Sequence, residues 1–422
     1  MDLLADLDAR GLFHDSTDRA ALAARLAAGP ITLYYGCDPT ADSLHHGNLI
    51  GLIMLRRFQD AGHTAIALAG GATGMIGDPS GRSEERNLLD DATLDHNVAA
   101  IKAQISRIVD VTGERGRLVD NRDWTQPIRL LEFLRDVGKH ATVNQMLARE
   151  SVRVRLESEQ GISFTEFSYM LLQANDYLWL HDHMGCELQI GGSDQFGNIL
   201  SGVDLIRRKR HAAVHAFAWP LLTADDGSKL GKSSGARIWL DPVQTSPYQF
   251  HQHWIRLDDR QLEQQLKFFS LRPLADIEAL LAEHAGAPER RVAQRALADE
   301  LTALVHGSEA ARAAGEAADV LFGGDPLRAS PAALETLAGE VPSSSTTRDA
   351  LSDTADLLAA TGLATSKSDA RRQLQQGGVR ANGVVLGPDD ELGGVPLLHG
   401  RYLLLRKGKR SYHLVEISPG EG

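Results

Sequence analysis

Cysteine and aromatic residues are scarce in this chain of 422 residues, which contains two cysteines and only 5% aromatic residues. Cys37 and Cys186 are too few for a disulfide framework or a cysteine-rich metal site in a chain of this length. The sequence therefore favours a protein of the reducing cytoplasm.

Long hydrophobic runs are absent as well. No stretch of about 18 apolar residues occurs, the length that a membrane-spanning helix needs. The first residues, from Met1 to Asp6, are acidic where a secretory signal would be basic. We therefore expect a protein that neither spans a membrane nor is exported.

Positive charge is in deficit, because 44 Lys and Arg residues stand against 56 Asp and Glu, a formal charge of −12. Contact with nucleic acid would therefore require a local basic patch and not global attraction. Residues 356–422 are the exception, with nine basic and seven acidic residues. The C-terminal segment is the expected place for such a patch.

The overall composition is that of a folded protein, with 43% hydrophobic and 24% charged residues. Its length predicts roughly two to four domains. In the first half, short apolar segments alternate with helical periodicity, which predicts an α/β fold with a parallel sheet covered on both faces. Strands are expected at residues 31–35, 64–69, 188–190 and 217–222, and helices at 48–61, 92–110, 127–138 and 166–180.

The second half has a different pattern. Residues 248–325 are rich in Ala, Leu, Arg, Glu and Gln at helical spacing, which predicts an all-helical unit. Residues 341–347 have the composition of a flexible linker. Beyond them, a helix at 367–376 and a hairpin signal at Asn382-Gly383 predict a small α+β module.

The loop from Asp38 to Asn48 follows the first strand and carries a hydroxyl, two imidazoles and a glycine at the start of a helix. In an open parallel sheet, ligands bind beyond the carboxyl ends of the strands. A helix N-terminus attracts anions, and Gly47 lets a ligand approach the backbone. The alternative is a capping Ser43 with surface histidines.

A second loop, Gly227 to Gly235, places Lys229 and Lys232 three residues apart in a glycine- and serine-rich stretch. Two ammonium groups on such a loop suit a triphosphate that must be held during reaction and then released. An ordinary lysine-rich surface loop is the alternative.

A polar stripe lies on the expected helix at 166–180, where Tyr169, Gln173 and Asp176 share one face. Apolar residues cover most of the remaining circumference, so the stripe is expected to face a cavity. A buried Asp176 could accept the hydrogen bond of a phenol, whereas an unpaired buried carboxylate would be costly. A solvated polar face is the alternative.

These motifs resemble those of one family. Residues 38–48 resemble the HIGH signature of class I aminoacyl-tRNA synthetases, and residues 227–235 resemble their KMSKS motif, in the same order along the chain. The likeness is closest to bacterial tyrosyl-tRNA synthetases, whose tyrosine-binding residues Tyr34, Tyr169, Gln173 and Asp176 match. Asn48 stands where the second HIGH histidine is usual; it keeps a donor and an acceptor but carries no positive charge.

The resemblance implies roles for residues throughout the first half. The tyrosine-binding residues would be Tyr34, Asp78, Tyr169, Gln173, Asp176, Gln189 and Gln195. The ATP-binding residues would be Gly36, Asp38, His45, Gly47, Asn48, Gly192, Asp194, Lys229, Lys232 and Ser233. Catalysis would rest on Thr40, His45, Arg82, Arg86, Lys229 and Lys232, which hold and neutralise the phosphates.

The C-terminal module resembles the S-four-like RNA-binding domain, and its basic residues would supply phosphate contacts to tRNA. Those residues would be Lys367, Arg371, Arg372, Arg406, Lys407, Lys409 and Arg410. The implied domains are a Rossmann-like catalytic domain (1–225), a mobile lysine loop (226–247), a helical domain on the anticodon side (248–330), a flexible linker (331–351) and the RNA-binding domain (352–422).

The implied reaction is that of a tyrosine–tRNA ligase, with tyrosine, ATP and the tyrosine tRNA as substrates. Magnesium would arrive bound to ATP without dedicated protein ligands. The resemblance also implies a cytoplasmic homodimer with no membrane or DNA partner. A tryptophan-specific synthetase, a non-catalytic RNA-binding paralogue and a small-molecule adenylyltransferase are the alternatives.

Overall fold

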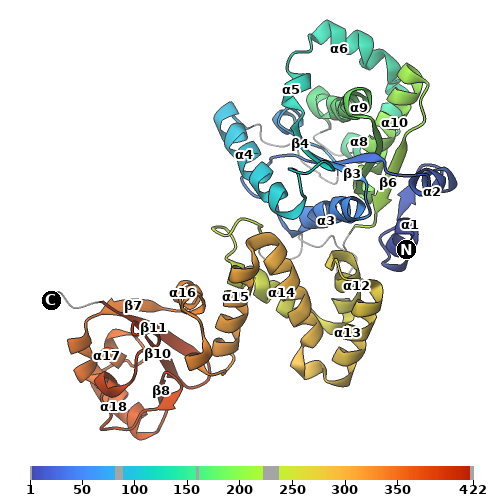
Figure 1. Ribbon diagram of the computed structural model, residues 1–422. Helices are drawn as coiled ribbons and strands as arrows, with labels where there is room; N and C mark the ends of the chain where they lie inside the picture. The colour runs from blue at the N-terminus through green and yellow to red at the C-terminus, as the bar shows by residue number, and fades with distance from the viewer. Residues whose placement is uncertain (1, 81–88, 158–160, 222–236, 419–422) are drawn as a thin grey trace. The chain divides into compact units, whose positions relative to one another are not determined.

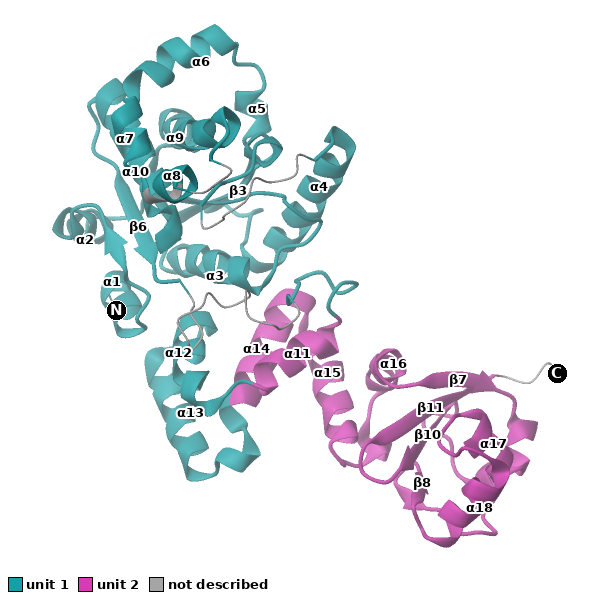
Figure 2. Cartoon of the chain, turned by 180° about the vertical axis from the view of Figure 1, so that it is seen from behind, with its two compact units in different colours: residues 1–245, 257–293 teal, residues 246–256, 294–422 magenta. Residues whose placement is uncertain are grey.

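The computed structural model describes residues 2–80, 89–157, 161–221 and 237–418 (Figure 1). The chain forms two compact units (Figure 2). Unit 1 comprises residues 1–245 and 257–293, and unit 2 comprises residues 246–256 and 294–422.

Unit 1 is built on a six-stranded sheet with the order β1-β6-β5-β2-β3-β4, in which only the short β1 is antiparallel to its neighbour. The predicted α/β fold with a parallel sheet is thereby confirmed. The strands are β1 (Asp15–Ser16), β2 (Thr32–Cys37), β3 (Thr64–Ala69), β4 (Gly116–Asp120), β5 (Cys186–Gly192) and β6 (His215–Trp219).

Helices cover the sheet of unit 1 on both faces (Figure 1). The helices of unit 1 are α1 (Leu3–Ala9), α2 (Arg19–Ala27), α3 (His46–Asp60), α4 (Asp91–Ile108), α5 (Arg122–Thr125), α6 (Leu130–Asp136), α7 (Val143–Leu147), α8 (Glu150–Leu156), α9 (Phe164–Met184), α10 (Phe196–Arg210), α12 (Asp259–Phe269) and α13 (Leu274–Gly286). Along the chain, β2 is followed by β3 and β4 on one side, whereas β5 and β6 lie on the other. The strand order therefore reverses between β2 and β5, which is where such folds open a ligand crevice.

Helix α9 lies in the core of unit 1. It begins at the capping Ser163 and ends at Gly185, whose left-handed backbone (φ 63°) closes the last turn. Its buried side chains include Tyr177, which is fully buried and donates its hydroxyl to the carbonyl of His215, 2.7 Å away. One face of α9 is thus fixed against β6, so the position of its other face is determined by the sheet.

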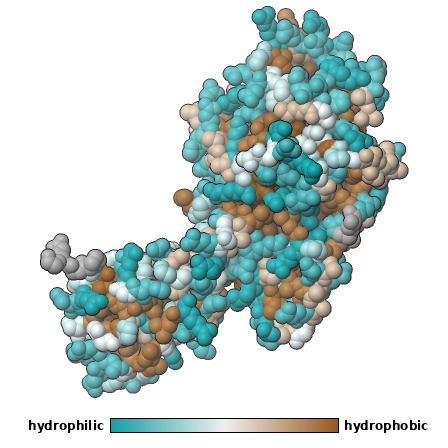
Figure 3. Space-filling model, viewed as in Figure 1, coloured by the Kyte–Doolittle hydropathy of each residue, from teal (hydrophilic) through white to brown (hydrophobic). Residues whose placement is uncertain are grey.

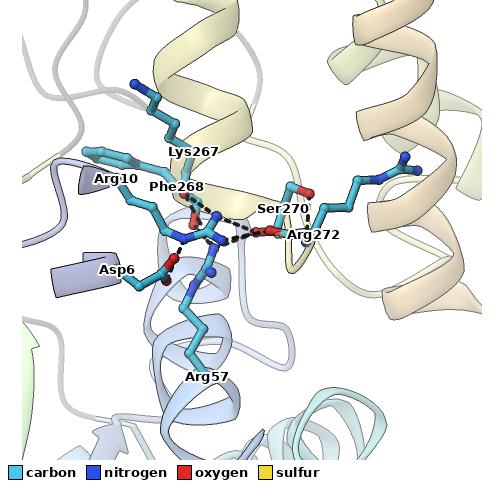
Figure 4. A network of polar contacts seen from close by, with 7 residues as sticks. All are labelled: Asp6, Arg10, Arg57, Lys267, Phe268, Ser270 and Arg272. Atoms are coloured by element: carbon cyan, nitrogen blue, oxygen red, sulfur yellow. Dashed lines mark hydrogen bonds and ion pairs between the residues drawn. The ribbon is translucent and has the colours of Figure 1, made fainter. Parts of the chain in front are cut away.

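Two buried arginines attach the C-terminal end of α12 to the rest of unit 1 (Figure 4). Arg57 of α3 donates to the carbonyls of Phe268 and Ser270, at 3.2 and 2.5 Å. Arg10 donates to the carbonyl of Arg272 at 2.7 Å and pairs with Asp6 at 2.7 Å. The last carbonyls of a helix have no partners within it and carry partial negative charge, so these guanidinium groups satisfy both needs.

Replacing Arg57 by Met should lower the stability of unit 1 by about 2–3 kcal/mol, because a buried carbonyl left without its donor costs roughly 1–3 kcal/mol. Arg207→Met is the control, since Arg207 of α10 is exposed and pairs with Asp204 at the surface. Its loss should cost less than about 1 kcal/mol. Calorimetric melting of the two variants measures the difference, and equal melting temperatures would contradict the assigned role of Arg57.

Unit 2 contains a second sheet, with the order β7-β11-β10-β8-β9. One face packs on α15 and α16 and the other on α17 and α18 (Figure 2). The strands are β7 (Ser343–Thr346), β8 (Val379–Ala381), β9 (Val384–Val385), β10 (Tyr402–Lys407) and β11 (Ser411–Ile417). The helices are α11 (Pro247–Ile255), α14 (Val292–His306, mostly in this unit), α15 (Ser308–Leu321), α16 (Pro331–Glu340), α17 (Thr354–Ala360) and α18 (Lys367–Gln375).

The prediction of a flexible linker at residues 331–351 is wrong. This segment forms α16, then β7, then a 3₁₀ turn at Arg348–Ser352. Strand β7 pairs in parallel with β11, so Ser344 lies opposite Val415. A run of serines can form a strand because the ladder is made by backbone groups, which composition does not reveal.

The compact units also divide the chain differently from the predicted domains. Helices α12 and α13, at residues 259–286, belong to unit 1, whereas α11, α15 and α16 form one unit with the C-terminal sheet. The predicted separation of a helical domain (248–330) from an RNA-binding domain (352–422) therefore does not follow the compact units. Most of the predicted mobile loop (226–247) lies outside the described residues.

Candidate active site

A cavity of about 370 Å³ opens in unit 1 at the carboxyl ends of β2, β3, β5 and β6. Its walls come from the loop after β2, the turn after β3, one face of α9 and the loop after β5. This is the point at which the strand order reverses, so the topology of the sheet places the cavity.

Three buried polar atoms on the cavity walls have no hydrogen-bond partner among the described residues. They are the hydroxyl of Tyr34, the side-chain oxygen of Gln189 and the side-chain oxygen of Gln173. Tyr34 and Gln189 face each other across β2 and β5 as direct register partners. Buried polar groups are nearly always paired, so unpaired ones around a cavity indicate a polar ligand.

The carboxylate of Asp176 lies at the buried end of the cavity, with an exposed fraction of 2%. One oxygen accepts from the indole of Trp124 at 2.8 Å and the other from the amide of Asn121 at 2.9 Å. Burial raises the pKa of Asp176 to about 7, although the two hydrogen bonds oppose the rise. The carboxyl can therefore change its protonation state near neutral pH.

Asp38, at the end of β2, connects the two sides of the cavity. It accepts from the hydroxyl of Tyr169 on α9 at 2.8 Å and from that of Thr73 after β3 at 2.7 Å. A Cβ at Gly70 would lie only 2.2 Å from a carboxylate oxygen of Asp38. A glycine is therefore required at position 70 for the two strand ends to be joined in this way.

Helix α3 begins with an imidazole as its cap. His45 accepts from the backbone N–H of Gly47 at 3.0 Å, while the side-chain oxygen of Asn48 accepts from the backbone N–H of His45 at 3.1 Å. A Cβ at Gly47 would lie 2.8 Å from the imidazole, so only glycine fits beneath it. Asn48 thus completes a reciprocal capping box at the anion-attracting end of the helix.

Asp78, in the loop after β3, meets the segment that follows β5. Its carboxylate accepts from the side-chain amide of Gln195 and, at 3.4 Å, from that of Asn198. Asp78 is 8% exposed and lines the same cavity as Gln195. A carboxylate and an amide therefore stand together on the wall formed by the two loops.

Comparisons with known proteins show the family of this chain. Residues 26–323 match the profile of the family described as tRNA synthetases class I (W and Y), and residues 333–415 match a tyrosine–tRNA ligase SYY-like C-terminal domain. The tyrosine–tRNA ligase of Opitutus terrae is 50% identical over 99% of this chain and 100% of its own length. That of Anaeromyxobacter dehalogenans is 51% identical over 99% of both chains. The chain belongs to the tyrosyl-tRNA synthetase family.

Solved structures of this family share the fold. The C-terminally truncated mitochondrial tyrosyl-tRNA synthetase of Aspergillus nidulans superposes with a TM-score of 0.66 at 33% identity, covering 76% of this chain and 94% of its own. The tryptophanyl-tRNA synthetase of Encephalitozoon cuniculi reaches a TM-score of 0.55 at 13% identity over 72% of this chain and 86% of its own, a likeness of fold alone.

The structure brings together every predicted tyrosyl-tRNA synthetase site residue of unit 1 that it describes. The cavity is lined by Tyr34, Gly36, Asp38, Thr40, His45, Gly47, Asn48, Asp78, Tyr169, Gln173, Asp176, Gln189, Gly192, Asp194 and Gln195. The other predicted residues, Arg82, Arg86, Lys229, Lys232 and Ser233, lie outside the described residues. The predicted polar stripe on α9 does face a cavity.

Among the cavity residues to which sequence reasoning assigned no role are Trp219, Arg237 and Trp239. The guanidinium of Arg237 lies over the ring of Trp239, 5.0 Å from its centroid. Trp239 also forms a β-bridge with His45, so the chain returning from the lysine-rich loop closes against the start of α3. The available signal was an arginine and a tryptophan, Arg237 and Trp239, within four positions of the end of that loop.

The predicted tRNA-binding residues lie in unit 2 and fall into two groups. Lys367 pairs with Asp353 and Asp356, and Arg372 pairs with Asp369. The second group has no ion pair with a carboxylate among the described residues; it comprises Arg371, Arg406, Lys407, Lys409 and Arg410. Only this second group offers positive charge that is not already neutralised.

Proposed function

We propose that the cavity of unit 1 is the site at which this tyrosine–tRNA ligase activates tyrosine with ATP and then transfers it to tRNA. The observation that carries the proposal is the set of buried, unpaired oxygens of Tyr34, Gln173 and Gln189 next to Asp176. A phenol and an ammonium group would supply the hydrogen bonds that these atoms lack.

In the proposed complex the phenol of tyrosine lies between Tyr34 and Asp176. The substrate hydroxyl donates to the carboxylate of Asp176 and accepts from the hydroxyl of Tyr34. Tyr169, Gln173 and Asp78 surround the amino group, and Gln195 lies toward the carboxyl end. Gln189 of β5 lies beside Tyr34, its register partner on β2. The cavity is thus a narrow slot whose buried end is polar.

We further propose that ATP lies along the start of α3. The surface beneath ATP would be formed by Gly36, Asp38, Gly47 and Asn48. The ribose would contact Gly192 and Asp194. The N-terminal end of α3, which carries the positive end of the helix dipole, would face the phosphates together with Thr40 and His45. Lys229, Lys232 and Ser233, together with Arg82 and Arg86, are proposed to approach the departing pyrophosphate.

Neither chemical step needs a nucleophile from the protein. The carboxylate of tyrosine attacks the α-phosphorus of ATP and displaces pyrophosphate; the terminal ribose of tRNA then attacks the tyrosyl carbonyl and displaces AMP. The protein contributes by holding the reacting groups in line and by stabilising charge on the phosphates. Magnesium would neutralise the phosphates as part of the ATP complex, bound by phosphate oxygens and water.

We also propose a homodimer formed through the face of α6, α7, α8 and the start of α9. Hydrophobic side chains reach the surface of both units (Figure 3). Eight of the fourteen exposed large hydrophobic residues of the described chain lie between residues 130 and 164. An exposed apolar patch of this kind marks an interaction surface. It consists of Leu130, Leu131, Leu134, Val143, Leu147, Val154, Leu156 and Phe164.

The compartment is proposed to be the cytoplasm. Cys37 and Cys186 are both buried free thiols, which suits a reducing compartment. In the described part of the chain, no helix is long and apolar enough to cross a membrane.

Amino-acid-dependent exchange of pyrophosphate into ATP tests the proposed site. Exchange is expected with tyrosine alone, and Tyr34→Phe should lower the tyrosine-to-phenylalanine ratio of kcat/KM by roughly two- to tenfold, the worth of one neutral hydrogen bond. Phenylalanine should otherwise be rejected because it leaves buried polar groups unpaired. Exchange with tryptophan, or an unchanged ratio of kcat/KM in Tyr34→Phe, would contradict the proposal that the phenol of tyrosine binds in this cavity.

Tyrosine binding should weaken as the pH falls through 7. Protonation of Asp176, whose pKa is about 7, removes the acceptor for the substrate phenol. Below that pH the Kd should rise by up to about tenfold per unit, and Trp124→Phe should move the onset up by about one unit because it removes a donor that favours the charged carboxylate. Equilibrium dialysis without ATP avoids titration of the phosphates, and a flat profile would contradict the role of Asp176.

Leu131→Asp should convert the dimer to monomers, because it places a charge in an apolar interface. Val243→Asp is the matched control, since Val243 is 92% exposed in unit 1 but lies outside the patch. Sedimentation equilibrium of the two variants measures the outcome. If Leu131→Asp remains a dimer, the interface does not include this patch.

A further inference from the structure

An exposed aromatic side chain of unit 2 is the chain neighbour of a glycine that approaches an arginine of the sheet. Phe322 caps the C-terminal end of α15 and is 73% exposed, so its ring is accessible to a partner. Its neighbour Gly323 reaches the sheet, since a Cβ at that position would lie 4.0 Å from a guanidinium nitrogen of Arg406. An accessible aromatic side chain and a cation therefore lie one residue apart along this contact.

The arginines belong to one row across the sheet. Arg406 of β10 pairs in register with Arg380 of β8 and with Tyr412 of β11. Tyr412 packs under α15 and donates to the carbonyl of Leu321, 3.1 Å away, so α15 covers the β11 end of the row. Arg380 is exposed and Arg406 is half-buried, so the β8 end of this face is open.

Two like charges directly opposite each other across neighbouring strands repel. Neither guanidinium has a carboxylate partner among the described residues. Arg380 donates to the carbonyl of Gly383 at 3.0 Å, and Arg406 donates to that of Gly408 at 2.9 Å. The guanidinium of Arg406 also lies over the ring of Tyr412, 5.3 Å from its centroid. These contacts fix the side chains but do not neutralise their charge. The pair therefore suits a bound anion, which would relieve the repulsion.

We propose that Phe322, Arg380 and Arg406 form a platform for an unpaired nucleotide of the tRNA. The arginines hold the backbone phosphate, and the ring of Phe322 stacks on the base. Basic side chains beside an exposed aromatic ring are the combination by which proteins bind single-stranded RNA. The inference rests on the proposed tRNA substrate and extends it, because it assigns a base contact to an apolar residue that charge patterns do not indicate.

The test compares Phe322→Leu with Phe322→Trp in the full-length protein. Leucine keeps an apolar side chain but removes the aromatic face, whereas tryptophan keeps the face. The Kd for tyrosine tRNA, measured by filter binding, should rise about fivefold to hundredfold in Phe322→Leu, and Phe322→Trp should bind nearly as tightly as the unaltered protein. Leu327→Ala, which truncates another exposed side chain of the same loop, should change the Kd less than twofold.

Salt dependence separates the two kinds of contact. Arg380→Gln and Arg406→Gln should each reduce the slope of log K against log salt by about 0.7–0.9, while Phe322→Leu should leave the slope unchanged. Tyrosine-dependent pyrophosphate exchange should be normal in all these variants. If the unaltered protein shows no such exchange, the proposed function is refuted. Binding of tRNA is measured without catalysis, so a failure of the platform can be told apart from a failure of the proposed function.

Three results would overturn the platform. One is an unchanged Kd for tRNA in Phe322→Leu. Another is equal weakening of binding to a fully paired RNA duplex, which offers no base to stack on. The third is a change in sedimentation of Phe322→Leu without RNA, which would make the exposed ring a contact between copies of this chain.

Discussion

One chain of hydrogen bonds holds the walls of the cavity at their positions. It runs from Tyr169 to Asp38, then to Thr73, Asn121 and Asp176, and each link measures 2.7 to 2.9 Å. Its members come from α9 and from the ends of β2, β3 and β4. Both carboxylates are therefore fixed before any ligand arrives, which lowers the cost of ordering them during binding.

The sequence revealed those site residues whose spacing follows a regular period. The stripe of Tyr169, Gln173 and Asp176 follows the helical repeat, and its expected exposure to a cavity is correct. Strand β4 was not predicted, since Gly116–Asp120 has few apolar residues. Because β4 was not predicted, the position of Asn121 directly after it was not predicted either. Asn121 connects Thr73 to Asp176.

Contacts made through the backbone were the least predictable. Gly70 is needed because Asp38 approaches its Cα, and no local pattern signals that approach. The serines of β7 form a strand by pairing with a segment about 70 residues away along the chain. At position 48 the resemblance indicated only that asparagine lacks the positive charge of the usual histidine. In the structure the side chain of Asn48 caps helix α3 by accepting from the backbone N–H of His45.

The interleaving of the two units has a consequence for the order in which the protein is assembled during synthesis. The chain passes between the units after residues 245, 256 and 293. The carbonyls that Arg10 and Arg57 hold at the end of α12 leave the ribosome more than 200 residues after those arginines. Until then Arg57 lacks these carbonyl partners and Arg10 has only Asp6 among the groups that it contacts here. Helix α11 is meanwhile made for a unit whose other helices do not yet exist. Neither unit can be completed as an independent N-terminal piece.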